Sequence, residues 1–481
     1  MANKKSKKML SAFSIILILI FGLGILSHIL PDAQFVNGEI VNGSGTIGAS
    51  LAEILKAPIL GFADAVDVAI FVMILGGFLA IVNRTKAFET GIKVLVQKLK
   101  GRELILIPIL MLIFSIGGTT YGMLEETVGF YVLLAAAMMA AGMDPLVGSA
   151  VILLGAGSGV LGSTINPFAT GAAISALPET IAVNRGVIII IATFLWLTTL
   201  LISIFFVTKY AAKVKKDKGS TFLSLREQKA AEKKFGSFSE GMDEDVKLTV
   251  KQKVTLCLFG LTFAVMIVGF IPWGEFNITI FDKFTGWLTG ESLGNWWFYE
   301  SALWFLIMSI IIGIINGMGE SGIVDAFVDG ADDMVGVVLV IAVARGASVL
   351  MGITHLDNYI IYNAAEFLAK LPEIAFVPLN YILHIILSVL VPSSSGLATL
   401  STPIIGPLSA QLGYNPEVSI MSMVAANGLV NLITPTCGAI MGGLALAKVE
   451  YSTWFRWALK VVITIAIANI VILSIFALIM H

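Results

Sequence analysis

The stretch Gly117–Phe168, GGTTYGMLEETVGFYVLLAAAMMAAGMDPLVGSAVILLGAGSGVLGSTINPF, decides the fold of this chain. It is apolar enough to lie in a lipid bilayer, yet it carries two adjacent carboxylates, several hydroxyl groups, an Asn-Pro pair and many glycines. A similar stretch occurs near the end of the chain, with PSSSGLAT at 392–399 and NGLVNLITP at 427–435. Two helix-breaking, polar membrane segments in corresponding places of two halves are typical of the binding site of a secondary transporter.

The composition places the chain among integral membrane proteins. Of its 481 residues, 57% are hydrophobic and 13% are charged, against about 25% charged residues in an average soluble domain. The two cysteines lie in apolar segments and the four histidines are scattered, so the sequence indicates neither a disulfide framework nor a zinc site. There is no P-loop motif for ATP. The apolar run Leu10–Leu30 is too long for a signal peptide, so we expect it to remain as a first crossing.

The first half of the chain begins with two helices and an arm. Four lysines before a helix at 9–30 place the N-terminus in the cytoplasm, because positive charge stays on that side. Residues 31–61, with one lysine, are then expected to form an external loop, and a helix at 62–83 returns to the cytoplasm. Residues 85–101 are too charged to span and are predicted to form an amphipathic arm at the inner surface.

A re-entrant hairpin is predicted over 103–142. Its first arm, Leu104–Ile116, is shorter than the roughly 20 residues that a crossing needs, and GGTTYG at 117–122 would turn in mid-membrane. The next segment, 145–177, is predicted to cross outward with a break around Gly162–Pro167.

A helix at 186–208 is predicted to end the first half on the cytoplasmic side. Residues 209–252 carry the densest positive charge in the chain and are interpreted as a cytoplasmic, solvated linker, the alternative being a lipid-binding or regulatory patch. A helix at 254–273 is an extra crossing, so the second half starts from the opposite side of the membrane.

The second half repeats the elements of the first in the opposite orientation. We expect helices at 301–318 and 335–351, joined by an acidic internal loop at 319–334, and then an arm at 355–370. A hairpin at 376–412 follows, with PSSSG at its tip. The half ends with a helix at 416–446 that is broken around 427–435 and with a helix at 457–479. The C-terminus is then external. The predicted fold class is an all-α polytopic membrane protein with an inverted repeat, two re-entrant hairpins and two broken helices.

Polar groups at the hairpins and breaks are the candidate substrate ligands. A broken helix leaves free N–H groups, which attract anions, and free C=O groups, which coordinate cations. The candidate substrate-binding residues are Gly118, Thr119, Thr120, Glu125, Glu126 and Asn166 in the first half and Ser393, Ser394, Ser395, Thr399, Asn427, Asn431 and Thr434 in the second. The alternative for the small residues among them is close helix packing.

Glu125 and Glu126 are the sharpest signal, because a carboxylate in the bilayer is costly unless it is protonated or paired. Adjacent positions on a helix point about 100° apart, so we expect only one of them to face the site. Their counterparts in the second repeat are Thr399 and Leu400, so the acid pair occurs in one half only and favours a cationic group or a proton. The alternative is a structural role, such as pairing with Arg345.

Three further side chains lie in or beside apolar segments. Arg345 has three open interpretations: it pairs with a glutamate, binds a substrate carboxylate, or extends to the membrane surface. His384 is interpreted as a hydrogen-bonded core histidine, with a proton relay as the alternative. Trp297 fits an interfacial belt.

Four long motifs carry a resemblance to a known family: GMLEETVGFYVLL at 122–134, LLGAGSGVLGSTINPFATG at 153–171, PSSSGLATLSTPIIGPL at 392–408 and NLITPTCGAIMGGLALAKVEYSTWFRW at 431–457. They resemble the YfcC family of bacterial membrane proteins, a branch of the C4-dicarboxylate anaerobic carrier group in the ion transporter superfamily. The resemblance implies an elevator-type transporter that forms a homodimer in the bacterial inner membrane. The implied scaffold parts are 1–101 and 253–370, the implied transport-domain parts are 102–208 and 371–481, and 209–252 links them.

The expected function is secondary active transport of a small polar solute, and the resemblance implies basic amino acid exchange of the arginine–ornithine kind. The candidate coupling ion is a proton or sodium. The expected partners are the solute, the lipid bilayer and a second copy of the chain, with no cofactor, metal site, catalytic residue or nucleic acid.

The first alternative is a cation- or proton-coupled C4-dicarboxylate symporter. Related folds use Ser-Asn-Thr at the hairpin tips, where this chain has Gly118-Thr119-Thr120 and Ser393-Ser394-Ser395. This difference disfavours a dicarboxylate substrate and a sodium site of the usual kind. A channel or an intramembrane enzyme is a more distant alternative.

Overall fold

The computed structural model describes residues 12–36, 39–98, 102–236, 247–271, 273–276 and 278–480. Within these ranges, nine helices are long and apolar enough to cross a membrane, as judged from length and composition. The lysines expected to orient the first helix, the end of the predicted arm and part of the predicted linker lie outside these ranges.

The first half of the described chain is helical apart from one short β-hairpin. Its elements are α1 (Ala12–Ile29), β1 (Phe35–Val36), β2 (Glu39–Ile40), α2 (Leu51–Asp64), α3 (Val66–Arg84), α4 (Ala87–Lys98), η1 (Glu103–Ile105), α5 (Leu106–Tyr121), η2 (Glu125–Gly129), α6 (Phe130–Ala140), α7 (Pro145–Gly162), the π-helical η3 (Pro167–Gly171), α8 (Ala172–Ser175) and α9 (Arg185–Lys216).

The connecting segment and the second half are also helical. Their elements are η4 (Lys218–Ser220), α10 (Leu225–Phe235), α11 (Val250–Phe270), η6 (Trp273–Phe276), η7 (Phe281–Lys283), α12 (Gly286–Thr289), α13 (Phe298–Asn316), α14 (Gly319–Thr354), α15 (Leu356–Leu368), α16 (Glu373–Leu390), α17 (Ser394–Gln411), α18 (Pro416–Val430), α19 (Gly438–Leu446) and α20 (Tyr451–Ile479).

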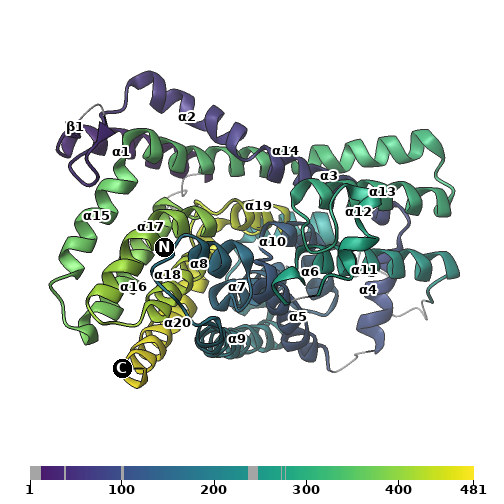
Figure 1. Cartoon of the computed structure of the whole chain (residues 1–481). Coiled ribbons are helices and arrows are strands. Elements are labelled where there is room, and N and C mark those ends of the chain that lie inside the picture. Colours follow the sequence, from purple (N-terminus) through teal and green to yellow (C-terminus); the bar gives the residue numbers. More distant parts are fainter. Residues whose placement is uncertain are drawn as a thin grey trace, which may run out of the picture.

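Helix α14 is the centre of one set of packed helices and also contacts α19. Figure 1 shows α14 running along one side of the molecule, with α2 and α3 packed against it. Helix α1 also packs on α14, α13 packs on α3, and α11 packs on α13 and α4. We call α1–α4, α11 and α13–α15 the frame, and we call α5–α9 and α16–α20 the bundle.

Two broken helices form the centre of the bundle. Every residue of α7 is buried, as is nearly every residue of α18. Helix α7 packs against α5, α9 and α18, and α18 packs against α16, α17 and α20. The two central helices approach closely, because a Cβ at Gly428 would lie 2.3 Å from Leu161 Cα. Each is interrupted where the sequence predicts, after Gly162 and after Val430.

Three segments expected to lack helix are helical. The predicted external loop 31–61 contains most of α2, which begins with a capping box between Ser50 and Glu53. The predicted acidic loop 319–334 is the first part of the 36-residue helix α14, whose Gly330 lies so close to α3 that a Cβ would be 2.3 Å from Gly76 O. The predicted solvated linker contains the end of α9 and all of α10, which buries Phe235.

The first arm of the hairpin is longer than expected. Residues Glu103–Tyr121 form a 19-residue apolar helical segment that is long enough to cross a membrane. The prediction of a short arm was wrong because GGTTY continues the helix instead of ending it.

Candidate functional site

The first hairpin turns at Gly122–Leu124, after the GGTTY segment that was expected to form the turn. Helix α5 ends at Tyr121, and Gly122 has a φ of +82°, in the left-handed region that favours glycine. A Cβ at Gly122 would lie 2.8 Å from Asn166 Nδ2, so glycine lets the tip lie against the break in the central helix. The turn therefore places Glu125, the first residue of η2, at the tip.

Gly118, Thr119 and Thr120 lie in the last turns of α5. Gly118 faces α7 so closely that a Cβ would lie 2.1 Å from Ala156 O. The Thr120 hydroxyl donates to Ile116 O at 2.7 Å within the same helix. These residues stay helical because their small side chains suit a packed helix, so their backbone N–H groups are not exposed at the tip.

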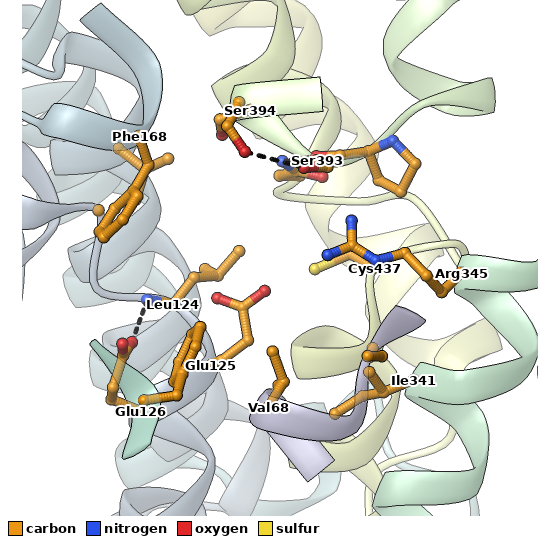
Figure 2. A pocket seen from close by; sticks show the side chains of 18 of the residues that line it. Val68, Leu124, Glu125, Glu126, Phe168, Ile341, Arg345, Ser393, Ser394 and Cys437 are labelled. Atoms are coloured by element: carbon orange, nitrogen blue, oxygen red, sulfur yellow. Dashed lines mark hydrogen bonds between the residues drawn. The ribbon is translucent and has the colours of Figure 1, made fainter. Parts of the chain in front are cut away.

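The two adjacent acids point in different directions. Figure 2 shows the Glu125 carboxylate directed into a cavity. Glu126 is only 4% exposed, and its Oε2 accepts a hydrogen bond of 3.1 Å from the Leu124 N–H (Figure 2). Glu125 is therefore the acid available to a ligand, while Glu126 holds the turn.

The second hairpin turns at Pro392–Ser393, where the sequence predicts its tip. Asn427 and Asn431 at the end of α18 both donate from Nδ2 to Pro392 O, at 3.2 and 2.9 Å. The Ser394 hydroxyl donates to Asn427 Oδ1 at 2.8 Å. Among the described residues, Asn431 Oδ1 is buried without a hydrogen-bond partner and is available to a ligand.

The break in α7 is held by hydrogen bonds of its own and is joined to the first hairpin through Thr119. Asn166 Oδ1 accepts from the Phe168 N–H at 2.9 Å, and Asn166 Nδ2 donates to Ser163 Oγ at 2.9 Å. The hydroxyl of Thr119 in α5 donates to Thr164 Oγ1 at 3.1 Å. Each broken helix therefore fixes the hairpin of its own half, and both tips meet at the same place.

A cavity of about 160 Å³, which we call the inner cavity, lies where the two tips meet the frame. Seven predicted residues line it: Glu125, Glu126, Asn166, Ser393, Ser394, Ser395 and Asn431. Thr399 lines an adjoining and more open cavity of about 620 Å³, which we call the outer cavity. The other predicted residues, Gly118, Thr119, Thr120, Asn427 and Thr434, line neither cavity.

The Arg345 side chain extends from α14 to the inner cavity, on the wall opposite Glu125 (Figure 2). Its Nε lies 2.8 Å from Asp64 Oδ2 at the end of α2. Its ion-pair partner is therefore an aspartate of the frame and not a glutamate. The sequence could not pair these residues, because they are distant along the chain.

Several lining residues were not predicted as part of the site. Tyr121 and Phe168 come from the hairpin tip and the α7 break, and Trp297 and Phe298 come from the start of α13. Tyr121 and Phe168 lie directly beside the helix breaks in the sequence, and this position could have identified them as site residues. The start of α13 carried no such signal, and Trp297 was interpreted only as a belt residue.

His384 lies away from both cavities, in a buried part of α16. Its Nδ1 lies 2.8 Å from Asn380 O and its Nε2 lies 2.6 Å from Ser401 Oγ, so both ring nitrogens have partners. This geometry fits the core histidine that the sequence predicts. In the described part of the chain, no group of three His, Cys, Asp or Glu side chains could hold a metal ion.

Comparison with known proteins gives a family match over almost the whole chain. The model of the C4-dicarboxylate anaerobic carrier family matches residues 9–479. An uncharacterized protein of Haemophilus influenzae is 28% identical over 421 residues, which are 86% of this chain and 75% of that protein. YfcC of Escherichia coli (strain K12), named as a proposed basic amino acid antiporter, is 26% identical over 407 residues, 82% of this chain and 74% of YfcC.

Two solved transporter structures are distantly similar. The YdaH transporter of Alcanivorax borkumensis has a TM-score of 0.44 and 15% identity, covering 96% of this chain and 97% of that one. MtrF of Neisseria gonorrhoeae has a TM-score of 0.44 and 18% identity, covering 98% and 96%.

Proposed function

The chain belongs to the C4-dicarboxylate anaerobic carrier family of membrane transporters, and on this premise we propose that it exchanges basic amino acids across the membrane. The proposal depends on one observation: the Glu125 carboxylate and the N-terminus of α17 face the same cavity. Glu125 binds the cationic side chain, and the free N–H groups and serines at 393–395 bind the carboxylate. The name of the Escherichia coli relative supports this substrate class.

The family description favours a second candidate, a C4-dicarboxylate symporter. A dicarboxylate in a cavity of about 160 Å³ would bring one carboxylate close to Glu125. Like charges this close repel each other, so this reaction requires a proton or a sodium ion between them. The same cavity accepts a basic amino acid without a further ion, and for this reason we place amino acid exchange first.

We further propose that transport proceeds by an elevator mechanism, with an inverted repeat, in which the bundle slides against the frame. This is supported by the inner cavity, because both hairpin tips and the break in α7 line it on one side and Arg345 of α14 lines it on the other. The frame contains the helices of the predicted scaffold parts, and the bundle contains those of the predicted transport-domain parts. The proposed assembly is a homodimer in the bacterial inner membrane, with the N-terminus cytoplasmic and the C-terminus external.

The test is transport by purified protein in proteoliposomes. Radiolabelled arginine, ornithine and succinate are supplied outside, with and without unlabelled amino acid inside. We expect arginine and ornithine uptake only with internal counter-substrate. Succinate uptake driven by a sodium or proton gradient, without arginine uptake, would refute amino acid exchange and favour the symporter.

A further inference from the structure

One charged group of the inner cavity comes from the frame. The carboxylates that line this cavity, Glu125 and Glu126, belong to the bundle, whereas Arg345 belongs to α14. A substrate with two charges would therefore contact both groups of helices at once. This arrangement lets Arg345 contact the substrate from the frame side of the cavity.

A close helix crossing positions Arg345. A Cβ at Gly61 of α2 would lie 2.3 Å from Ala342 O of α14, and one at the neighbouring Gly346 would lie 2.6 Å from the α2 backbone. The backbones of α2 and α14 therefore touch beside Arg345. This contact fixes the distance between Arg345 and Asp64, which are on different helices of the frame.

The ion pair leaves most of the guanidinium free. Asp64 Oδ2 contacts Nε, and the structure gives Nη1 and Nη2 no partner among the described residues. Figure 2 shows the end of the guanidinium directed into the inner cavity. The side chains of Arg345 and Asp64 are 31% and 50% exposed, and ion pairs this exposed are held weakly. A ligand can therefore approach the free edge without breaking a strong contact.

Arg345 also belongs to the wall that the two cavities share. It lines both of them, together with Ser393 and Ser395 of the second hairpin, while Asp64 lines only the outer cavity. An anionic group in either cavity therefore lies near the Arg345 side chain.

We propose that Arg345 recognises the carboxylate of the substrate and that Asp64 is the positioning residue that orients its guanidinium. The two nitrogens of the free edge form paired hydrogen bonds with the two carboxylate oxygens, a geometry that lysine cannot supply. The second hairpin then closes on the same carboxylate. The substrate class rests on the proposed function: it is a small solute that has a carboxylate as well as a cationic side chain.

This role predicts discrimination against the decarboxylated amine. Agmatine has the guanidinium of arginine but lacks its carboxylate, so it would leave Arg345 without a partner in the cavity. The first test measures kcat/KM for arginine and agmatine in proteoliposomes for the wild type, Arg345→Gln and Asp64→Asn. Arg84→Gln is the matched control, because Arg84 is a frame arginine that pairs with Asp329 and lines neither cavity.

We expect Arg345→Gln to lower kcat/KM for arginine by roughly 10- to 100-fold, the loss expected for a charge-assisted contact. Agmatine transport should be unchanged. Asp64→Asn should raise KM for arginine several-fold without changing kcat or agmatine transport. Equal losses for arginine and agmatine in both variants would show a structural role and refute the proposal.

A second test does not depend on the identity of the substrate. Ser175 is exposed and lines the outer cavity with Arg345, so Ser175→Cys, in a chain whose Cys257 and Cys437 are replaced by serine, supplies a thiol that reagents can reach. The rates at which anionic and cationic methanethiosulfonates modify this introduced cysteine report the charge of the cavity wall that Arg345 contributes. Arg345→Gln should lower the anionic-to-cationic rate ratio about 10-fold or more. An unchanged ratio would refute anion recognition by Arg345, whereas failure of amino acid exchange alone would refute only the proposed function.

Discussion

Helix α10 of the connecting segment makes the most directly testable structural contact in the molecule. Its Glu227 is 3% exposed and accepts three hydrogen bonds: from the Ser224 N–H at 2.7 Å, the Glu450 N–H at 2.8 Å and the Thr453 hydroxyl at 3.1 Å. The last two donors are at the start of α20, in the other half of the chain. We therefore expect Glu227→Ala to release α10 from the bundle.

The size of the effect follows from these contacts. A buried donor that loses its acceptor costs about 1–3 kcal/mol, and the substitution leaves two such donors at α20. Loss of the capping box at Ser224 adds about 1 kcal/mol to this cost. Water that enters the opened contact bonds to the freed donors and lowers the total cost. We expect a net loss of about 3 kcal/mol, which raises the population of detached α10 by about 100-fold.

Limited proteolysis with trypsin measures this opening, because cleavage at lysines of α10 requires the helix to detach. The matched control is Glu232→Ala, on the exposed face of the same helix. Cleavage of Glu227→Ala should be about 100-fold faster than cleavage of the control. Equal cleavage rates would show that α10 is not held by Glu227 and that the linker is solvated, as the charge pattern alone suggests.

Three further predictions concern the bundle and its motion. Glu125→Gln should lower the apparent affinity for a basic amino acid by roughly 10- to 100-fold in proteoliposomes. Glu126→Gln should change this affinity much less, because Glu126 bonds to the hairpin backbone. Equal effects of the two substitutions would contradict the assignment of Glu125. Gly118→Ala should destabilise the protein by about 1–3 kcal/mol in thermal unfolding, because the added Cβ meets Ala156 O. Gly260→Ala, which has open space around it, should not destabilise the protein. The same unfolding midpoint for both variants would contradict close packing at Gly118. A third test places cysteines at Val337 of α14 and Gly442 of α19, where the Cβ atoms would lie 3.1 Å apart. The pair should form a disulfide after a small adjustment toward a Cβ–Cβ distance of about 3.8 Å, and this disulfide should block transport until it is reduced. Full transport by the oxidised protein would refute sliding of the bundle against the frame.

The order of the structural elements could be predicted from the sequence. Apolar runs separated by charged segments gave most helices, and the Gly, Pro, Ser and Asn clusters gave the breaks in α7 and α18. The acid pair and the serine tip were recognised as site candidates because a polar group in an apolar segment is costly wherever the chain folds. All of these features depend on neighbours in sequence, so a single sequence is enough to predict them.

Local pattern failed where packing between distant segments outweighed it. The GGTTY segment looked like a turn, but contact with α7 keeps it helical through Tyr121, and this moves the hairpin tip to Glu125. The acidic start of α14 looked like a loop, but it packs on α3 at Gly330. The charged linker looked solvated, but the start of α20 supplies donors for Glu227.

The chain by itself therefore determined the class of protein, the breaks in the two central helices, the serine turn at 392–395 and a list of candidate polar residues. The tertiary structure alone decided which of these residues line one cavity, that the Glu125 carboxylate is directed into it while Glu126 accepts a hydrogen bond from the Leu124 N–H, and that Arg345 is held by Asp64. The physical reason is the range of the forces. Burial and helix propensity act along neighbouring residues, whereas a cavity and an ion pair require side chains from helices that only the packed fold brings together.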